Sequence, residues 1–436
     1  MENKGTKSFL EDNELTRVPT EKRTGFWAIV AVLMNWIINP TPAITGGSIA
    51  SEMMLTPAIL AIFVGAIVLG AYSLPLAVAS ANEGLSTSMI SRSSFGDKGA
   101  NIVSAAMAIA NVIFYGVVVG VFVMSLEGVV GVEAGSFTVW GGIVFAVVMA
   151  TSAFFGYKGV ELLSKLSVIP MMLLFLYAAY LGIKQGGGWN AISQIPPASG
   201  VEMPFGLAVT GTIGIFTVGA TLTGDVTRYG KPGKKSGWAS FVSFGIGFAI
   251  FVSLGAIAVK GTGMGDLISV IVQAGGPVFT VIGFALLLIS SWSGADNNVY
   301  SAGLALSKIF KAPKYIFTII TAAIGMLIAA TGVYNNLFIY LGILAMLIPP
   351  IGIIIAIDYF YVKKDVKDKM ANIVAYNWEA IIAWGIAVVA DLLTANNIFG
   401  GYVFGRVIGV SGINSLVIAG VVYFILAIAK KKKLAA

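Results

Sequence analysis

The stretch Asn35-Trp-Ile-Ile-Asn-Pro-Thr-Pro-Ala-Ile-Thr-Gly-Gly-Ser-Ile-Ala-Ser51 interrupts the first long apolar segment of the chain with two prolines and a glycine pair. Pro40 and Pro42 supply no backbone N–H, so the carbonyls four residues earlier, on Trp36 and Ile38, lose their helical partners. In hydrocarbon, such carbonyls are tolerated only against protein, water or an ion. One interpretation is a proline kink whose carbonyls are satisfied by Ser and Thr side chains. The combination of two prolines and two glycines favours the other, a broken helix that lines a site.

The composition is that of an integral membrane protein. Of the 436 residues, 57% are hydrophobic and 11% are charged, whereas about a quarter of residues are charged in soluble domains. Apolar runs of about twenty residues recur along the chain, and each can cross a hydrocarbon core of roughly 30 Å. We expect an all-α protein with about twelve transmembrane helices, because runs of this length are typical of helices and not of barrel strands.

The basic residues are distributed as a membrane topology predicts. The net charge is +7. With both termini in the cytoplasm, only Lys184, Lys260 and Arg406 of the 27 Lys and Arg residues fall outside, in agreement with the positive-inside rule. The polar tail of residues 1–24 lacks the apolar core of a signal peptide. We therefore expect a multi-pass protein of the cell inner (cytoplasmic) membrane, which contacts the lipid bilayer and not nucleic acid.

Several kinds of chemistry are excluded by composition. The chain has no Cys and no His, which excludes disulfides, thiol chemistry, imidazole metal sites and histidine proton relays. It also lacks a phosphate-binding glycine loop followed by Lys-Ser or Lys-Thr. We expect neither an enzyme activity nor a resident cofactor, and any proton-linked step must use a carboxylate.

Gly and Thr crowd the centre of the sixth span, residues 211–225. A second broken helix here, five spans after the first, predicts two inverted repeats of five helices that cross near the bilayer midplane. The repeats would be residues 25–185 and 203–362, followed by two further helices in 374–430 and a cytoplasmic tail, 431–436. Close packing of small residues is the alternative explanation for the Gly and Thr.

Polar residues in membrane segments gather in spans one, three, six and eight, the four helices that surround a central site in such an arrangement. Span eight carries the polar tract 290–300. Its hydroxyls, with carbonyls freed in span one, suit a hard cation. Phe114 and Phe216 could sandwich a flat ring, and the amide of Asn111 could read the edge of that ring. No counter-charge is evident at mid-depth in spans one, three or six, so a neutral substrate is expected.

These residues resemble motifs of the nucleobase:cation symporter 1 family, purine-cytosine permease type, and most closely its bacterial cytosine permease group. The matching segments occur in the same order and cover nearly the whole chain. They are Thr45-Gly46-Gly47, Ser91 to Gly96, Thr221 to Asp225 with Arg228-Tyr229, Asp296 to Leu304, Tyr334-Asn335-Asn336-Leu337, Ile348 to Gly352, and Asn377-Trp378. The resemblance implies a LeuT-like 5+5 inverted-repeat fold with helices 1 and 6 broken, alternating access, and uptake of a nucleobase with a cation, usually sodium.

The resemblance also implies site residues. The coupling ion, Na+, would bind the carbonyls of Asn35, Ile38 and Ser290 and the hydroxyl of Ser293. Gly294 stands where the family carries a second hydroxyl, for which Ser291, a water or proton coupling through Asp296 could compensate. The implied substrate-binding residues are Asn39, Thr41, Asn111, Phe114, Phe216 and Val218. The family has Gln and Trp in place of Asn111 and Phe114, and a small polar residue in place of Val218, so a wider slot is expected here.

The leading hypothesis is a secondary active transporter, functional as a monomer, that imports a cytosine-like or related planar heterocycle by cation symport. Three alternatives stay open. The first is proton-coupled nucleobase uptake, and the second is a LeuT-type carrier for hydantoin, allantoin or an amino acid. The third is a channel or receptor, which cannot accumulate a neutral solute against a gradient.

Overall fold

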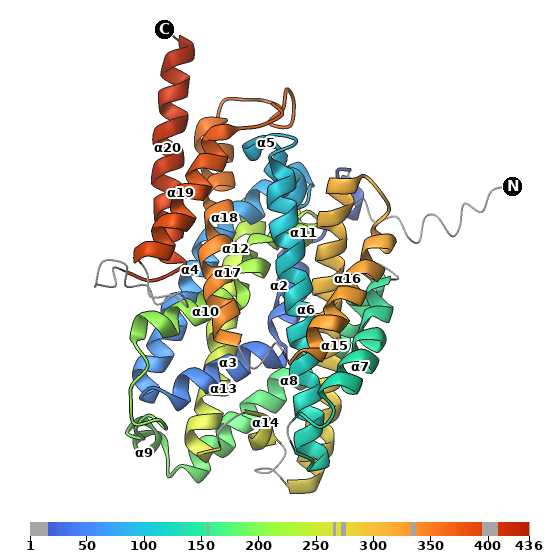
Figure 1. Cartoon of the computed structure of the whole chain (residues 1–436), viewed down its shortest axis with the longest axis vertical. Helices are drawn as coiled ribbons and strands as arrows, with labels where there is room; N and C mark the ends of the chain where they lie inside the picture. Colours follow the sequence, from blue (N-terminus) through green and yellow to red (C-terminus); the bar gives the residue numbers. More distant parts are fainter. Residues whose placement is uncertain are drawn as a thin grey trace, which may run out of the picture.

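The computed structural model describes residues 16–133, 135–154, 157–264, 267–271, 276–332, 337–394 and 409–435. Part of the predicted cytoplasmic tails (1–15 and 436), Arg406 and the motif residues Tyr334-Asn335-Asn336 therefore lie outside the described residues. The described part of the chain is helical and contains no β-strand apart from an isolated bridge between Thr24 and Gly230 (Figure 1).

One to three consecutive helical segments lie at every predicted span. In the first half these are α2 (Phe26–Ile37) with α3 (Pro40–Ser51), α4 (Leu55–Glu83), α6 (Ala100–Val130), α7 (Thr138–Phe154) and α8 (Tyr157–Gln185). In the second half they are α10 (Phe205–Thr221) with α11 (Thr223–Thr227), α12 (Lys234–Phe241) with η2 (Val242–Gly247) and α13 (Phe248–Thr262), α15 (Gly276–Phe310), α16 (Lys314–Ala330), and α17 (Leu337–Leu347) with α18 (Pro349–Ile357) and η5 (Asp358–Val362). Two helices follow, α19 (Trp378–Thr394) and α20 (Ile413–Ala435).

Lengths and compositions agree with a multi-pass membrane protein. Among the described residues, seven helices are long and apolar enough to cross a membrane, or eight if the bent pair α2 and α3 forms one span. Shorter apolar helices cover Thr138–Thr151, Ile169–Gln185 and Lys314–Ala330, and α19 has 17 residues. The predicted inner loop between the second and third spans contains a short helix, α5 (Thr87–Phe95).

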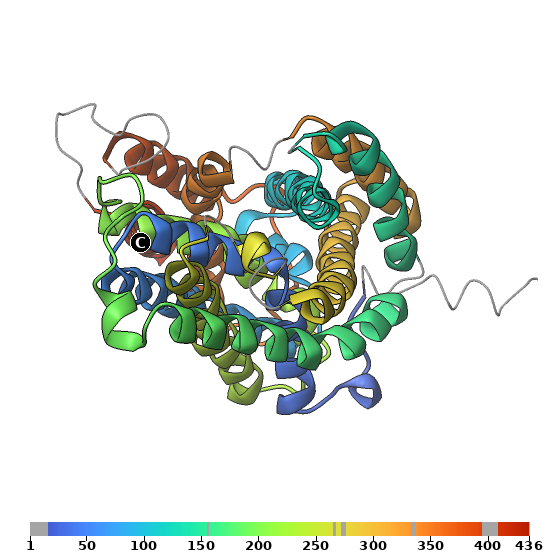
Figure 2. The ribbon, with the colours of Figure 1, turned by 90° about the horizontal axis from the view of Figure 1, so that it is seen from below.

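Helix packing shows the exchange of partners that two inverted repeats produce. The first span, through α3, packs on the seventh, α13, and the second span, α4, packs on the sixth, α10. In the same way α8 packs on α13 while α4 packs on α18, and α6 and α7 pack on α15 and α16. Viewed along the bundle, α7 and α16 lie on the side opposite α19 and α20 (Figure 2). Because helices of each half pack on helices of the other, α3, α6, α10 and α15 meet at the centre of the molecule.

The predicted break in the first span is confirmed. The axes of α2 and α3 meet at 59°. Asn39 begins α3: its Oδ1 accepts from the backbone N–H of Thr41 at 3.1 Å, and its Nδ2 donates to the Trp36 carbonyl at 2.9 Å. Pro40 follows at the first helical position, where its missing N–H has no cost. One of the two carbonyls that the prolines leave free is thus capped by Asn39.

The sixth span is interrupted within the predicted segment 211–225, but near its end and not at its Gly- and Thr-rich centre. The helix α10 runs unbroken through the Gly- and Thr-rich centre to Thr221, and the interruption lies at Leu222, before α11. The bend there is small enough for α10 and α11 to count as one span. A Cβ atom on Gly214 would lie 2.2 Å from the carbonyl oxygen of Leu341. Close helix packing, the alternative left open by the sequence, therefore explains the centre of this helix.

Polar contacts tie the helices together at the end of the molecule that carries α5 and the C-terminal end of α20 (Figure 1), which we call the α5 end. The backbone N–H of Thr87 donates to Asp225 Oδ1 at 3.2 Å, which links α5 to α11. Arg228 follows α11, is fully buried and donates from Nη2 to the hydroxyl of Tyr300 in α15 at 3.1 Å. Arg17 forms an ion pair with Glu83 at 3.1 Å.

Candidate functional site

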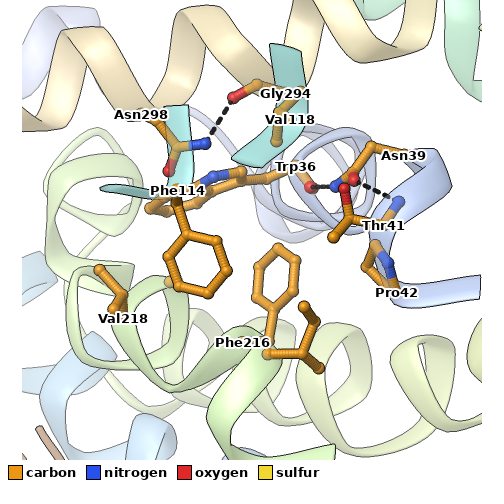
Figure 3. Close-up of a pocket in the computed structure, with 12 residues that line it drawn as sticks. Trp36, Asn39, Thr41, Pro42, Phe114, Val118, Phe216, Val218, Gly294 and Asn298 are labelled. Carbon is orange, nitrogen blue, oxygen red and sulfur yellow. Dashed lines mark hydrogen bonds between the residues drawn. The ribbon is translucent and has the colours of Figure 1, made fainter. Parts of the chain in front are cut away.

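A cavity lies at the break between α2 and α3, and α6, α10 and α15 complete its walls (Figure 3). Its lining residues come from the four spans that the sequence identified: Trp36, Asn39, Thr41, Pro42, Phe114, Val118, Ile215, Phe216, Val218, Gly219, Gly294 and Asn298. The volume is about 30 Å³, which is room for roughly two water molecules. In this conformation the cavity is therefore contracted, and a ring-sized ligand requires the side chains to spread.

Phe216 is held firmly in the wall of this cavity. Its ring makes an edge contact with Trp36, with centroids 6.1 Å apart and planes at 77°. Behind it lie Phe244 and Phe248, with centroids at 5.6 and 5.4 Å. The ring also covers Gly219, where a Cβ atom would lie 2.6 Å from it. Aromatic packing on three sides and a glycine beneath fix the orientation of this ring.

Phe114 reaches the same cavity from α6, in the other half of the fold. Its side chain is 8% exposed, and both it and Phe216 point into the cavity (Figure 3). Two aromatic rings that enter one cavity from different helices can stack against the faces of a flat ligand.

Two uncharged polar groups face the cavity. Thr41 is 3% exposed, and its hydroxyl has no hydrogen-bond partner among the described residues. Asn298 uses Nδ2 to donate to the Gly294 carbonyl at 3.0 Å, and its Oδ1 is turned toward Phe114 and the cavity (Figure 3). None of the lining residues carries a charge. The cavity can therefore satisfy a donor and an acceptor of a neutral ligand but offers no counter-ion.

All the predicted substrate residues except Asn111 line this cavity: Asn39, Thr41, Phe114, Phe216 and Val218. Asn111 is fully buried on α6 but is not a lining residue. Its Nδ2 donates to the Met107 carbonyl at 2.7 Å, and its Oδ1 has no hydrogen-bond partner among the described residues. The structure thus does not bring the Asn111 amide to the ligand position in this conformation.

Sequence reasoning did not assign Trp36 or Asn298 to the site. Asn298 lies in the polar tract of span eight, four residues after Gly294, so helical spacing places both on one face. That spacing could have identified Asn298. The sequence analysis identified Trp36 only by its freed carbonyl. No sequence pattern indicated the direction of its side chain.

The predicted cation ligands lie together beside the cavity. The Ser290 hydroxyl donates to the Ile38 carbonyl at 2.7 Å, the second carbonyl left free by the prolines. The Asn35 side chain donates from Nδ2 to the Ser293 hydroxyl at 2.9 Å. Every one of these residues is at most 2% exposed. Two hydrogen bonds therefore join the end of α2 to the middle of α15.

The chemistry of this cluster suits a monovalent hard cation. The atoms that could bind the ion are carbonyl and hydroxyl oxygens, the ligands that unwound helices present to Na+. Across the described residues, no group of three or more His, Cys, Asp or Glu could hold a metal ion. A Cβ atom on Gly294 would lie 3.4 Å from Asn39 Cβ, an ordinary van der Waals contact, so a small side chain fits at this position. Gly294 and Asn39 both also line the cavity, so the cation cluster and the cavity adjoin.

Comparison with known proteins agrees with this geometry. The family described as permease for cytosine/purines, uracil, thiamine, allantoin matches residues 17–418. The cytosine permease of Escherichia coli (strain K12) is 27% identical over 401 residues, which cover 90% of this chain and 93% of that protein. The allantoin permease of Bacillus subtilis (strain 168) is 25% identical over 399 residues, which cover 81% and 79%.

Solved structures share the fold. Mhp1, a nucleobase-cation-symport-1 family transporter, in a closed conformation with bromovinylhydantoin bound has a TM-score of 0.76 at 17% identity, with 98% of this chain and 96% of Mhp1 covered. Its inward-facing conformation has a TM-score of 0.78 at 16% identity, with 97% and 95% covered. A Na+-coupled sialic acid symporter has a TM-score of 0.67 at 12% identity, with 97% and 93% covered. The chain therefore belongs to the family of permeases for cytosine, purines, uracil, thiamine and allantoin, and is a multi-pass membrane transporter with the LeuT-like fold.

Proposed function

We propose that this transporter imports a neutral, planar, nucleobase-like heterocycle together with Na+ across the cytoplasmic membrane. The observation that carries the proposal is the contact between two sites. An uncharged cavity with Phe114 and Phe216 in its walls adjoins a cluster of carbonyl and hydroxyl oxygens at the break of the first span.

The substrate is selected by shape and by hydrogen bonds. The aromatic rings accept a flat ligand, Asn298 Oδ1 accepts from a ring N–H, and the Thr41 hydroxyl pairs with a neighbouring carbonyl or ring nitrogen. A ligand that leaves either buried group unpaired loses about 1–3 kcal/mol. Cytosine and uracil present such a donor and acceptor on adjacent ring atoms. A charged ligand is disfavoured, because no side chain in the wall offers the opposite charge.

Cation and substrate binding are coupled through Asn39. Na+ at the Ile38 carbonyl replaces the hydrogen bond from Ser290 and also takes the Ser293 hydroxyl as a ligand, so it holds the end of α2 against α15. Asn39 is the next residue, caps α3 and lines the cavity. An ion that fixes the carbonyl of Ile38 therefore also fixes one wall of the substrate cavity.

The orientation follows from charge. The α5 end carries Lys363, Lys364 and Lys430–Lys431, and the positive-inside rule assigns such an end to the cytoplasm. Both termini would then be cytoplasmic. One chain contains both halves of the cavity, so we propose that the monomer transports.

Uptake by cells that express the protein tests the substrate class. Radiolabelled cytosine, uracil, hypoxanthine and thymine are offered separately, with the empty vector as control. Saturable accumulation above the external concentration of at least one ring is expected. Background uptake of every ring would contradict the proposal, and equilibration without accumulation would indicate a channel.

A second candidate substrate class is the five-membered ureide ring of hydantoin or allantoin. No carboxylate is among the residues that line the cavity, so none requires an exocyclic amine, and both rings carry an N–H beside a carbonyl. Relatives of this chain include an allantoin permease and a transporter with a bound hydantoin. Adding these two rings to the uptake panel decides between the classes.

The coupling ion needs its own experiment. Uptake is measured in proteoliposomes with a sodium gradient and no proton gradient, and then with a proton gradient and no sodium gradient. Accumulation driven by sodium alone is expected. Accumulation that persists without sodium but collapses when a proton ionophore is added would assign the coupling to a carboxylate instead.

A further inference from the structure

We propose that a second cavity, at the α5 end, binds the headgroup of an anionic phospholipid from the cytoplasmic leaflet. This cavity has a volume of about 300 Å³ and lies between α20, the end of the α18–η5 segment, α5 and the chain that enters α19. Its lining residues are Ser93, Asp358, Val362, Lys363, Asn372, Ile373, Val374, Asn377, Glu379, Tyr423, Ala427, Lys430 and Lys431. The inference does not depend on which solute the protein transports.

Position favours a lipid over a soluble ligand. The apolar part of α20 ends at Ala429, and Lys430 and Lys431 follow directly. Residues at such a boundary lie at the depth of lipid headgroups, where lysine side chains extend toward the phosphates. One wall of the cavity is apolar, with Val362 and Ala427 among its residues, and suits the glycerol and upper acyl chain of a lipid.

Charge favours an anion. Three lysines line the cavity against two carboxylates, Asp358 and Glu379. Both carboxylates are already engaged within the wall. Asp358 accepts from the Tyr423 hydroxyl at 2.7 Å and pairs with Lys363 at 3.2 Å, and Glu379 pairs with Lys430 at 2.9 Å. Lys431 adds a positive charge at the rim, so the cavity is positive overall.

A buried hydroxyl provides an independent indication of a ligand. Ser93 is 4% exposed and lines the cavity, yet its hydroxyl has no hydrogen-bond partner among the described residues. A buried donor without a partner is energetically unfavourable, so a ligand that accepts from it gains stability. A phosphate oxygen of a bound headgroup would accept from this hydroxyl while the lysines at the rim neutralise its charge.

The cavity is connected through α5 to the end of the sixth span. Ser93 belongs to α5, whose first residue, Thr87, contacts Asp225 and donates from its hydroxyl to the Thr221 carbonyl at 2.9 Å. Lys363 donates to the Ser93 carbonyl. A lipid in this cavity would therefore brace α5 against α18 and α20, and through α5 the end of the sixth span.

The test is a thermal unfolding series on the purified, delipidated full chain. Phosphatidylglycerol is added in parallel with phosphatidylcholine of the same acyl chains, and with glycerol 3-phosphate as the soluble form of the same phosphate. We expect phosphatidylglycerol alone to raise the unfolding midpoint. An equal rise with phosphatidylcholine would show a general lipid effect, and an equal rise with glycerol 3-phosphate would show a free-anion site; either result overturns the proposal.

Variants place the effect in this cavity. The double change Lys430→Gln, Lys431→Gln should remove at least half of the rise caused by phosphatidylglycerol. Ala427→Trp, which fills the apolar side and leaves every charge, should do the same. The matched control is Lys234→Gln, Lys235→Gln, which removes the same charge from exposed lysines at the start of α12. In this control, phosphatidylglycerol should still raise the unfolding midpoint as it does in the unchanged protein. If phosphatidylglycerol raises the unfolding midpoint of both cavity variants by the full amount, the lipid does not bind in this cavity.

Discussion

The hydroxyl of Ser290 lies 2.7 Å from the carbonyl oxygen of Ile38 and donates to it. This bond satisfies a carbonyl that Pro42 deprives of its helical partner, and it comes from a helix 252 residues away in sequence. The same carbonyl is the proposed Na+ ligand. The hydroxyl of Ser290 thus satisfies the same buried carbonyl that the proposed ion would coordinate.

Replacing Ser293 by Ala should weaken sodium activation. The change removes a proposed ligand oxygen, and interactions with charged groups contribute about 1.5–3 kcal/mol, so the sodium concentration for half-maximal uptake should rise at least tenfold. Ser307→Ala is the matched control, since its hydroxyl lies further along α15, outside the proposed ion site, and is also buried without a hydrogen-bond partner among the described residues. Equal sodium dependence in both variants would remove Ser293 from the ion site.

Gly294→Ser should strengthen sodium binding. A Cβ atom fits there, 3.4 Å from Asn39 Cβ, and the added hydroxyl would supply one more oxygen beside the existing ligands. The half-activating sodium concentration should fall several-fold relative to Gly294→Ala, which adds the Cβ without the oxygen. If the Ser and Ala variants behave alike, the new oxygen does not reach the ion.

Thr41→Val should raise the KM for the transported ring. Valine keeps the shape and removes the only hydroxyl among the described residues that line the cavity. A lost hydrogen bond to a buried polar edge costs about 1–3 kcal/mol, so an increase of roughly fivefold or more is expected. Thr45→Val serves as control, because Thr45 lies one turn further along α3, does not line the cavity, and donates to the Thr41 carbonyl. An unchanged KM in Thr41→Val would exclude the hydroxyl from recognition.

Tyr300→Phe should favour conformations open at the α5 end. The change removes the hydroxyl that Arg228 contacts across the gap between the sixth and eighth spans. A hydrogen bond to a charged group contributes about 1.5–3 kcal/mol, so the open population should rise roughly tenfold. The chain has no cysteine, so an introduced Val218→Cys can be labelled from that side without background. Tyr229→Phe is the control, since it removes a similar 3.2 Å bond between neighbouring residues and should leave the labelling rate unchanged.

Gly214→Ala should destabilise the protein. The added Cβ would lie 2.2 Å from the Leu341 carbonyl oxygen, and overpacking of this kind costs about 1–3 kcal/mol, so the midpoint of thermal unfolding should fall. Gly206→Ala on the same helix is the control, because its nearest neighbour would be Val410 Cγ2 at 3.4 Å. Equal midpoints for the two variants would show that α10 and α17 can separate without cost.

The sequence by itself determined the membrane class, the positions of the spans and the break in the first one. These properties are local. A long run of apolar residues is more stable in the hydrocarbon core than in water, and a proline lacks its N–H in any tertiary context. The sequence also indicated the family, because its polar motifs occur in the same order as those of the family. The polar residues that interrupt apolar helices are few and specific.

Only the tertiary structure decided how the freed groups are satisfied and which side chains face the ligand. Pro40 and Pro42 specify that the Trp36 and Ile38 carbonyls need partners. The partner of Trp36 is Asn39, three residues away in sequence, but the partner of Ile38 is Ser290 on a distant helix. Helical spacing placed Asn111 near Phe114, yet the packing of α6 turns its amide to Met107 and leaves Phe114 in the cavity. The direction of a side chain at mid-membrane depends on its neighbours from distant helices, and those are set by the crossing of the two repeats.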